Sequence, residues 1–251
     1  MNKKFEFTGE TKAILGNTLH RIRALISFGK VGAGELGGWI EKEENLDASG
    51  NAWVSGNAQV SGNAQVSGNA QVCDDAQVSG NAQVSGNACV YGDAQVYGDA
   101  QVSGNARVYG DAWVFVNAWV CGDAWVFGNA RVYGIARVYG DARVSGNAQV
   151  SGNARVYGDA RVSGNARVYK RGAIFWISNV GSRDDTATFF ACRDKKIKVI
   201  VGCFFGDLDG FAAAVQKTHG DNTHAKVYRL AIEMAKERIK MDDMPEESND
   251  G

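Results

Sequence analysis

Proline is almost absent from this 251-residue chain, which contains one proline beside 32 glycines. Glycines scattered at random are typical of flexible low-complexity chains, but here they recur at a fixed spacing, which indicates a repeat architecture. No apolar run approaches the length of a transmembrane helix, so none is expected. The formal charge of −1 offers no global attraction for nucleic acid or for an anionic membrane surface.

Cysteine is present but lacks metal-ligand spacing. The five cysteines form no Cys-x-x-Cys pair and no Cys/His cluster, so we predict reduced thiols, no metal site and no cofactor. The basic start at Lys3 and Lys4 resembles that of a signal peptide, but the polar stretch from Phe5 to Glu10 breaks the apolar segment that should follow. A cytoplasmic protein is therefore expected.

A six-residue repeat occupies the middle of the chain. From Ser49 it runs Ser/Tyr-Gly-Asn/Asp-Ala-Gln/Arg-Val, and twenty valines stand six residues apart from Val54 to Val168 without insertion. Residues flanking an inward valine point outward in an extended strand, so each hexad is a short strand followed by a glycine-containing turn. One hexad cannot bury its valine alone, and stacked coils are predicted to do so. The glycine position is expected to take a positive φ, which suits Asp74 tolerably and Val116 badly.

This pattern resembles the hexapeptide-repeat family, whose members fold as left-handed parallel β-helices with three hexads per triangular coil. The resemblance implies an all-β solenoid of between six and seven coils, here followed by a small α+β domain. The segments Phe7–Lys12, Leu19–Leu25 and Leu36–Glu41 also look like the opening of solenoid proteins encoded by bacteria, phages and prophages. Such proteins are often labelled hexapeptide transferases or polymer-forming proteins from the repeat alone.

Four regions are predicted from the change of pattern along the chain. Residues 1–48 are expected to form capping strands, because an open solenoid end is an unpaired sheet edge. Residues 49–169 form the solenoid. Residues 170–240 are expected to form an α+β domain, with a hairpin across Arg193–Lys196, a helix near Leu208–Thr218 ended by Gly220, and a second helix from about Asn222 to Lys240. The acidic residues 241–251 are predicted to be disordered.

The family resemblance suggests an enzyme, but the repeat argues against one. Many hexapeptide-repeat proteins are acyltransferases that bind acyl-CoA between subunits of a trimer and use a histidine as general base, commonly with a loop inserted between coils. The twenty hexads contain neither histidine nor inserted loop. Their aspartates alternate with asparagine at one position, which favours turn chemistry through bonds to nearby backbone. No catalytic residue is predicted in the rod, and His219 and His224 remain candidates for a C-terminal site.

Large aromatic side chains interrupt the polar outer positions near the middle of the rod. Three tryptophans in consecutive hexads should encircle the rod within one coil, with other aromatics around them. Outward aromatics mark an interface, or they stack from coil to coil as a ladder, and both alternatives stay open. The predicted partner or self-association residues are Tyr109, Trp113, Phe115, Trp119, Trp125, Phe127, Tyr133 and Tyr139.

Charge divides along the rod. Residues 49–106 carry four aspartates and no basic residue, a formal charge of −4, whereas residues 107–169 carry seven arginines and four aspartates, a formal charge of +3. Because the arginines are expected on all three sides of the rod, a nucleic-acid groove is disfavoured.

The sequence is compatible with three functions. The first is a non-catalytic, self-associating β-solenoid scaffold or binding protein, a homo-oligomer (a trimer by the family resemblance) whose C-terminal domain gives specificity for a partner. The second is an acyl-CoA-dependent acyltransferase. The third, implied by the resemblance to phage proteins, is an inhibitor or ligand-sequestering protein with a host protein as partner. No membrane partner is expected.

Overall fold

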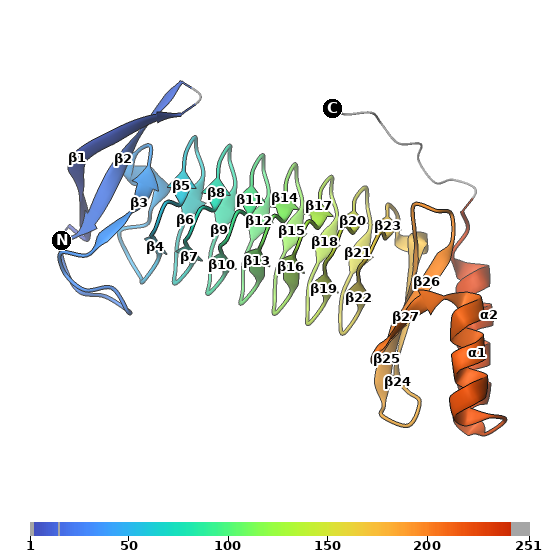
Figure 1. Cartoon of the computed structure of the whole chain (residues 1–251). Coiled ribbons are helices and arrows are strands. Elements are labelled where there is room, and N and C mark those ends of the chain that lie inside the picture. The colour runs from blue at the N-terminus through green and yellow to red at the C-terminus, as the bar shows by residue number, and fades with distance from the viewer. Residues whose placement is uncertain (1–2, 15, 242–251) are drawn as a thin grey trace.

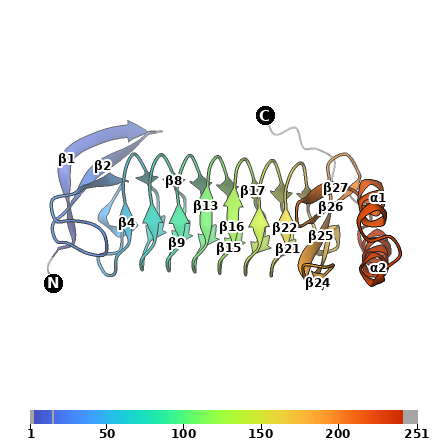
Figure 2. The same cartoon turned by 60° about the horizontal axis from the view of Figure 1, so that its bottom comes forward.

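The protein is a straight rod with a different cap at each end (Figures 1 and 2). The structure, a computed structural model, describes residues 3–14 and 16–241. The disordered tail expected over 241–251 lies outside these residues, apart from Met241. Antiparallel strands cover the N-terminal end of the rod, and a four-stranded sheet with two helices covers the C-terminal end. Within the described residues, no helix is both long enough and apolar enough to cross a membrane.

Three parallel sheets form the faces of the rod, which we number in chain order. Face 1 contains β4 (Trp53–Val54), β7 (Gln71–Val72), β10 (Cys89–Val90), β13 (Arg107–Tyr109), β16 (Trp125–Phe127), β19 (Arg143–Val144) and β22 (Arg161–Val162). Face 2 contains β5 (Gln59–Val60), β8 (Gln77–Val78), β11 (Gln95–Val96), β14 (Trp113–Val114), β17 (Arg131–Val132), β20 (Gln149–Val150) and β23 (Arg167–Val168). Face 3 contains β6 (Gln65–Val66), β9 (Gln83–Val84), β12 (Gln101–Val102), β15 (Trp119–Val120), β18 (Arg137–Val138) and β21 (Arg155–Val156).

Each strand pairs with the strand three hexads further on. Val96 of β11 lies beside Val114 of β14, and the backbone N–H of Gln95 donates to the carbonyl of Ala112 at 2.9 Å. Three hexads therefore make one 18-residue coil, which confirms the predicted parallel solenoid; the rod has about seven turns, where six to seven coils were expected. Its left-handed sense stays an expectation from the family resemblance.

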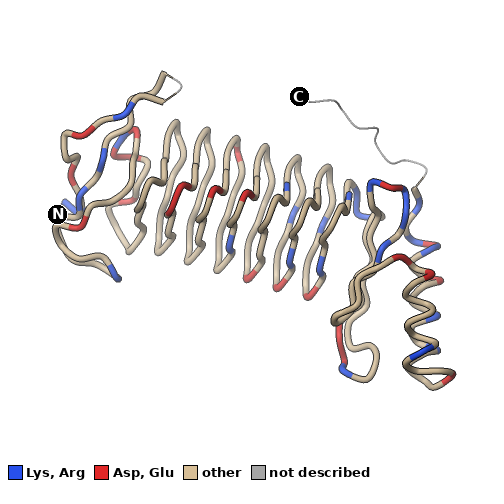
Figure 3. Tube along the Cα trace, in the orientation of Figure 1, with Lys and Arg blue, Asp and Glu red and all other residues tan. Residues whose placement is uncertain are grey.

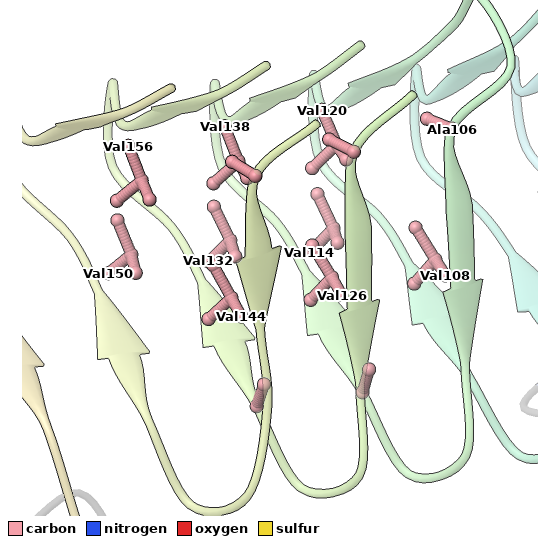
Figure 4. Packing of buried hydrophobic residues seen from close by; sticks show 14 of the residues in the cluster. Ala106, Val108, Val114, Val120, Val126, Val132, Val138, Val144, Val150 and Val156 are labelled. Atoms are coloured by element: carbon pink, nitrogen blue, oxygen red, sulfur yellow. The ribbon is translucent and has the colours of Figure 1, made fainter. Parts of the chain in front are cut away.

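Columns of valine and alanine fill the rod. All twenty repeat valines and the alanines two residues before them are at most 1% exposed. Figure 4 shows the valines of successive coils pointing into the interior, one above the other. The inward phase continues past the repeat, because Ile174 and Val180 are also buried. The small alanine lets the three faces approach one another closely.

Glycine is required at the corners for two reasons. Gly104 has a φ of 69°, in the left-handed region that side chains with a Cβ adopt with strain. A Cβ on Gly104 would also lie 2.8 Å from the backbone nitrogen of Gly122 in the next coil. The two predicted exceptions are confirmed, since Asp74 has a φ of 60° and Val116 a φ of 63°.

The N-terminal cap extends face 2 and closes the first coil. β1 (Phe5–Ile14) and β2 (Asn17–Ala24) form an antiparallel hairpin beside β3 (Leu36–Ile40), and β3 pairs in parallel with β5. A 3-10 helix at Glu43–Asn45 follows, and the buried Asn45 amide donates to the carbonyls of Gly62 and Ala64. These contacts satisfy backbone groups that an open first coil would leave unpaired.

A lysine is buried in this cap. The Lys4 side chain is 2% exposed, and its Nζ donates to the carbonyls of Asp47 at 3.0 Å and Ala52 at 2.7 Å. Burial lowers the pKa of Lys4, while the charge of Asp47 opposes that shift. The ammonium also lies over the Phe28 ring, 4.6 Å from its centroid. Lys4 thus ties the chain entering the rod to its first turn.

The C-terminal domain is an antiparallel sheet with two helices on one side. After a 3-10 helix at Arg171–Ala173, the sheet runs β24 (Ile174–Val180), β25 (Asp185–Ala191), β26 (Ile197–Val201) and β27 (Phe204–Asp207). α1 (Leu208–His219) is capped by Asp207 at its start and by Gly220 at its end, and α2 (Thr223–Arg238) is capped by Asn222 at its start. The predicted hairpin and helices are confirmed. Gly202 (φ 54°) turns the chain between β26 and β27, so the segment Ile197–Phe205 contributes to two strands.

This domain closes the end of the rod. The backbone N–H of Arg161 donates to Thr188 Oγ1 of β25 at 3.1 Å, and Lys198 Nζ of β26 donates to Asn165 Oδ1 at 3.2 Å. The Phe205 ring lies over Gly164, where an added Cβ would meet it at 2.7 Å. The last coil is therefore covered by a sheet face instead of being left as an open edge.

Replacing Lys4 by methionine tests the cap. Methionine fills similar space but leaves the carbonyls of Asp47 and Ala52 without their donor, so we expect Lys4→Met to lower the free energy of unfolding by about 1–3 kcal/mol in urea denaturation. Lys3→Met is the matched control, because the Lys3–Glu43 ion pair is about half exposed on both sides and should contribute ~0–1 kcal/mol. Equal stability of the two variants would contradict the role assigned to Lys4.

Candidate functional site

The three predicted tryptophans lie within one coil, one on each face. Trp113, Trp119 and Trp125 begin β14, β15 and β16 on faces 2, 3 and 1. Each indole is covered by an arginine of the next coil. The distance from the guanidinium carbon to the ring centroid is 4.7 Å for Arg131 over Trp113, 4.9 Å for Arg137 over Trp119 and 4.8 Å for Arg143 over Trp125. Such contacts stabilise stacked coils through cation–π attraction.

We call the three tryptophans and the outward aromatic side chains around them the belt. The other aromatic side chains of the belt stack along the rod axis. Adjacent ring centroids are 4.8–5.0 Å apart in three columns. The columns are Tyr91–Tyr109–Phe127 on face 1, Tyr97–Phe115–Tyr133 on face 2 and Tyr139–Tyr157 on face 3. Within the chain, these rings therefore contact one another from coil to coil, as in a ladder.

One corner of the rod exposes apolar side chains beyond these ladders. Val116 is 44% exposed, Trp119 41% and Ile135 61%. Val116 occupies the glycine position and Ile135 the asparagine position of consecutive coils, between faces 2 and 3. The two turns are stacked, since the N–H of Asn117 donates to the carbonyl of Gly134 at 3.0 Å. We call Val116, Trp119 and Ile135 the apolar corner.

Both turn residues of the apolar corner act against the fold. A β-branched residue at positive φ costs on the order of 1 kcal/mol or more. Ile135 also removes an amide from a position where other coils carry interlocking side chains: Asn63 Nδ2 donates to Asn81 Oδ1 at 3.1 Å, and Asn81 Nδ2 to Asp99 Oδ1 at 2.9 Å. Two residues that disfavour the turn while exposing apolar surface point to selection for contact with something else.

These amide ladders correct the expectation for the Asn/Asp position. We predicted that the side chains bond to nearby backbone, whereas most of the hydrogen bonds of these side chains join adjacent coils, as from Asn87 Nδ2 to Asn105 Oδ1 at 2.9 Å. An asparagine both donates and accepts, so it propagates the ladder. An aspartate only accepts, so Asp123 is the last acceptor of the ladder that starts at Asn51. The sequence could have shown this through the 18-residue spacing of the asparagines.

The arginines of the rod lie on all three faces, as the sequence predicted, and the acidic and basic halves are visible in Figure 3. The apolar corner lies close to the boundary between the halves. The thiol of Cys73 lies in the acidic half and contributes little reactivity. Burial, with help from Asp74 and Cys89, raises the pKa of Cys73 to about 11, and a protonated thiol is a poor nucleophile.

His219 lines a small cavity in the C-terminal domain. The cavity, of about 180 Å³, lies between the sheet and the helices, and its lining includes Ser182, Gly202–Phe204 and His219. His224 lies beside it, with its ring centroid 5.6 Å from that of His219. Burial and the charge of Asp185 raise the pKa of Tyr228, which also lines the cavity, while Arg183 opposes the shift.

The His219 cavity is too small for acyl-CoA, and the described residues contain no cluster of His, Cys, Asp or Glu able to hold a metal ion. Its polar side chains suit a small polar molecule or a backbone segment. The third histidine, His20, is distant from this site because it stacks on Phe7 in the N-terminal cap, at 4.6 Å between ring centroids.

A larger cleft, of about 430 Å³, lies where face 3 meets the C-terminal domain. Its lining comes from the last coils, from β24 and from the end of α2: Tyr139, Arg155, Tyr157, Arg171, Ile174, Phe175, Trp176 and Arg238. Of these residues the sequence had singled out Tyr139 alone. No local pattern joins Arg155 to Arg238, because folding of the C-terminal domain onto the rod brings them together.

Comparison with known proteins agrees with the architecture. The model of the YdcK β-solenoid repeat family matches residues 58–74, 82–98, 100–114, 136–152 and 148–161. All five segments lie within the rod, so this similarity concerns the repeat and leaves the two caps outside it. No curated protein matches the sequence. Fold and comparison together define a β-solenoid repeat protein.

Replacing Val116 by glycine tests the strain at the apolar corner. Glycine relieves the positive φ, so Val116→Gly is expected to raise the free energy of unfolding by about 1 kcal/mol in urea denaturation. Gly134→Val, in the same column one coil later, is the reciprocal control and should destabilise, since a Cβ there would lie 3.0 Å from the nitrogen of Gly152. Measurement at two protein concentrations separates this gain from any loss of association. A Val116→Gly variant less stable than the wild-type protein would show that Val116 does not strain the turn.

Proposed function

We propose that this protein is a non-catalytic, self-associating β-solenoid scaffold, in which the apolar corner joins two copies and the C-terminal domain provides specificity for a partner. The observation that carries the proposal is the placement of Val116 and Ile135, two exposed apolar residues, at turn positions where the repeat favours glycine and asparagine. Exposed apolar surface maintained at a cost to the turn is typical of an interface.

The distribution of charge favours a second copy of this chain as the occupant. The apolar corner lies near the middle of the rod, with the acidic repeats on one side of it and the basic repeats on the other (Figure 3). Two rods packed side by side and antiparallel around this corner would set the acidic half of each against the basic half of its partner. A parallel trimer, expected from the family resemblance, would instead place like charges side by side.

The shape of the rod suits a scaffold. Coils locked by backbone hydrogen bonds make a stiff spacer, and the chain ends in different domains at opposite ends (Figure 1). In an antiparallel pair, the two C-terminal domains would face away from each other, one at each end of the assembly. Two identical domains held apart at a fixed distance can bind two sites on a partner with enhanced avidity. The absence of histidine from the twenty hexads is consistent with a role that needs no general base there.

Ile135→Asn tests self-association without harming the fold, because it restores the repeat residue. We expect the wild-type chain to be a dimer by native mass spectrometry and light scattering, and Ile135→Asn combined with Trp119→Gln to be a monomer, since the pair removes the exposed apolar surface. Added salt should weaken the wild-type dimer.

Trp125→Gln is the matched control for this experiment. Trp125 belongs to the same belt but lies on face 1 between the guanidinium groups of Arg107 and Arg143, at 5.1 and 4.8 Å. The variant should therefore remain a dimer. A monomeric wild-type protein would refute self-association, and a wild-type trimer unaffected by the corner substitutions would support the arrangement that the family resemblance implies.

A further inference from the structure

Three arginines line the cleft between face 3 and the C-terminal domain. Arg155 comes from β21, Arg171 from the 3-10 helix before β24, and Arg238 from the last turn of α2. Among the residues that the structure describes, no aspartate or glutamate lines this cleft. Within the part of the chain that the structure describes, none of these three arginines forms an ion pair or stacks on an aromatic ring.

Several other arginines of the protein contact aromatic rings or hydrogen-bond partners within the chain. Arg131, Arg137 and Arg143 cover tryptophans, and Arg229 donates to Gln216, Gly220 and Asp221. Three like charges gathered at one place repel one another unless an anion lies between them. Guanidinium groups bind phosphate with paired, charge-assisted hydrogen bonds, so phosphate is the anion this arrangement suits best.

One wall of the cleft is aromatic. Tyr157 stacks on Tyr139 at 5.0 Å between ring centroids, and the Trp176 ring meets Tyr157 edge-on at 4.4 Å. Tyr157 is 41% exposed even though it is part of this wall. An exposed tyrosine beside a tryptophan provides a surface on which a planar ring can stack. At the same repeat position, many coils carry serine, so the tyrosine is not required by the solenoid.

The size of the cleft limits the ligand. About 430 Å³ lies within the range of small-molecule sites, which are commonly 300–1,000 Å³. It can hold a molecule with one phosphate chain and one ring system. Because the lining comes from both the rod and the C-terminal domain, such a ligand would contact both at once. The His219 cavity, at about 180 Å³, has less than half this volume.

We infer that this cleft binds a mononucleotide: the phosphates would lie among Arg155, Arg171 and Arg238, and the base would stack against Tyr157 and Trp176. The site is separate from the apolar corner, so the inference does not depend on self-association. Binding would make and break no covalent bond. The bound nucleotide would act as a ligand that holds the C-terminal domain against the rod.

Calorimetric titration of the full chain with ATP and GTP tests the inference. We expect saturable binding of at least one of them with one site per chain. Arg171→Ala and Arg238→Ala should each weaken binding about tenfold or more, since each removes a charged hydrogen-bond donor to phosphate. Arg155→Gln and Tyr157→Ser restore common repeat residues, so they should fold normally while each weakens binding by about tenfold.

Arg161→Gln is the matched control. It removes the same charge from the neighbouring strand β22 on face 1, outside the cleft, and should leave the affinity unchanged. Adenosine and tripolyphosphate, tested separately, should each bind more weakly than ATP, because each makes only half of the contacts.

Several results would overturn the inference. These are no binding of either nucleotide, equal binding of tripolyphosphate and ATP, or equal effects of Arg161→Gln and Arg171→Ala. Tight binding of single-stranded oligothymidylate without binding of either mononucleotide would also overturn it in favour of a nucleic-acid site. The oligomeric state measured in parallel keeps this outcome distinct from failure of the scaffold proposal.

Discussion

The backbone hydrogen bonds between coils are the constraint on which the rest of the molecule depends. They run in one register, as from Gln95 N–H to the Ala112 carbonyl and from Tyr97 N–H to the Val114 carbonyl, at 2.9 and 3.0 Å. Because this register is 18 residues, each side chain lies against its counterpart in the next coil. Valine packs on valine, glycine approaches glycine and asparagine bonds to asparagine. Because each coil pairs with its neighbours, the first and last coils would have unpaired backbone groups. The N-terminal cap with the buried Lys4 and the C-terminal sheet cover these two ends.

Since the inward valines and alanines already define the solenoid, the outward positions can vary without loss of the fold. That freedom explains why stacked tyrosines, arginine-covered tryptophans and asparagine ladders occur side by side on one rod. It also separates two kinds of departure from the repeat. The aromatic columns add contacts between coils, whereas Val116 and Ile135 add none that the turn requires and expose apolar surface. A departure of the second kind is the stronger indication of a binding surface.

The two surfaces proposed for binding differ in how they arise. The apolar corner is made of residues within 20 positions of one another, in consecutive coils. The nucleotide cleft joins Arg155, Arg171 and Arg238 from separate elements, at the junction of rod and C-terminal domain. One surface would set how rods associate, and the other would respond to a small molecule where the domain meets the rod. A scaffold with both could couple ligand binding to the orientation of its terminal domain.

By itself, the sequence determined the solenoid, the three-hexad coil implied by its family resemblance, the positive φ of Val116, the placement of one tryptophan on each face and the two C-terminal helices. The three-hexad coil, and with it the placement of the tryptophans, came from the family resemblance. The solenoid and the helices follow from strict periodicity and from caps such as Asp207, Asn222 and Gly220, which act within a few residues. Tertiary structure alone decided that arginines cover the tryptophans and that Arg155 and Arg238 line the same cleft. Those contacts depend on which side chains face each other after the coils stack and the C-terminal domain docks, and no local pattern encodes that.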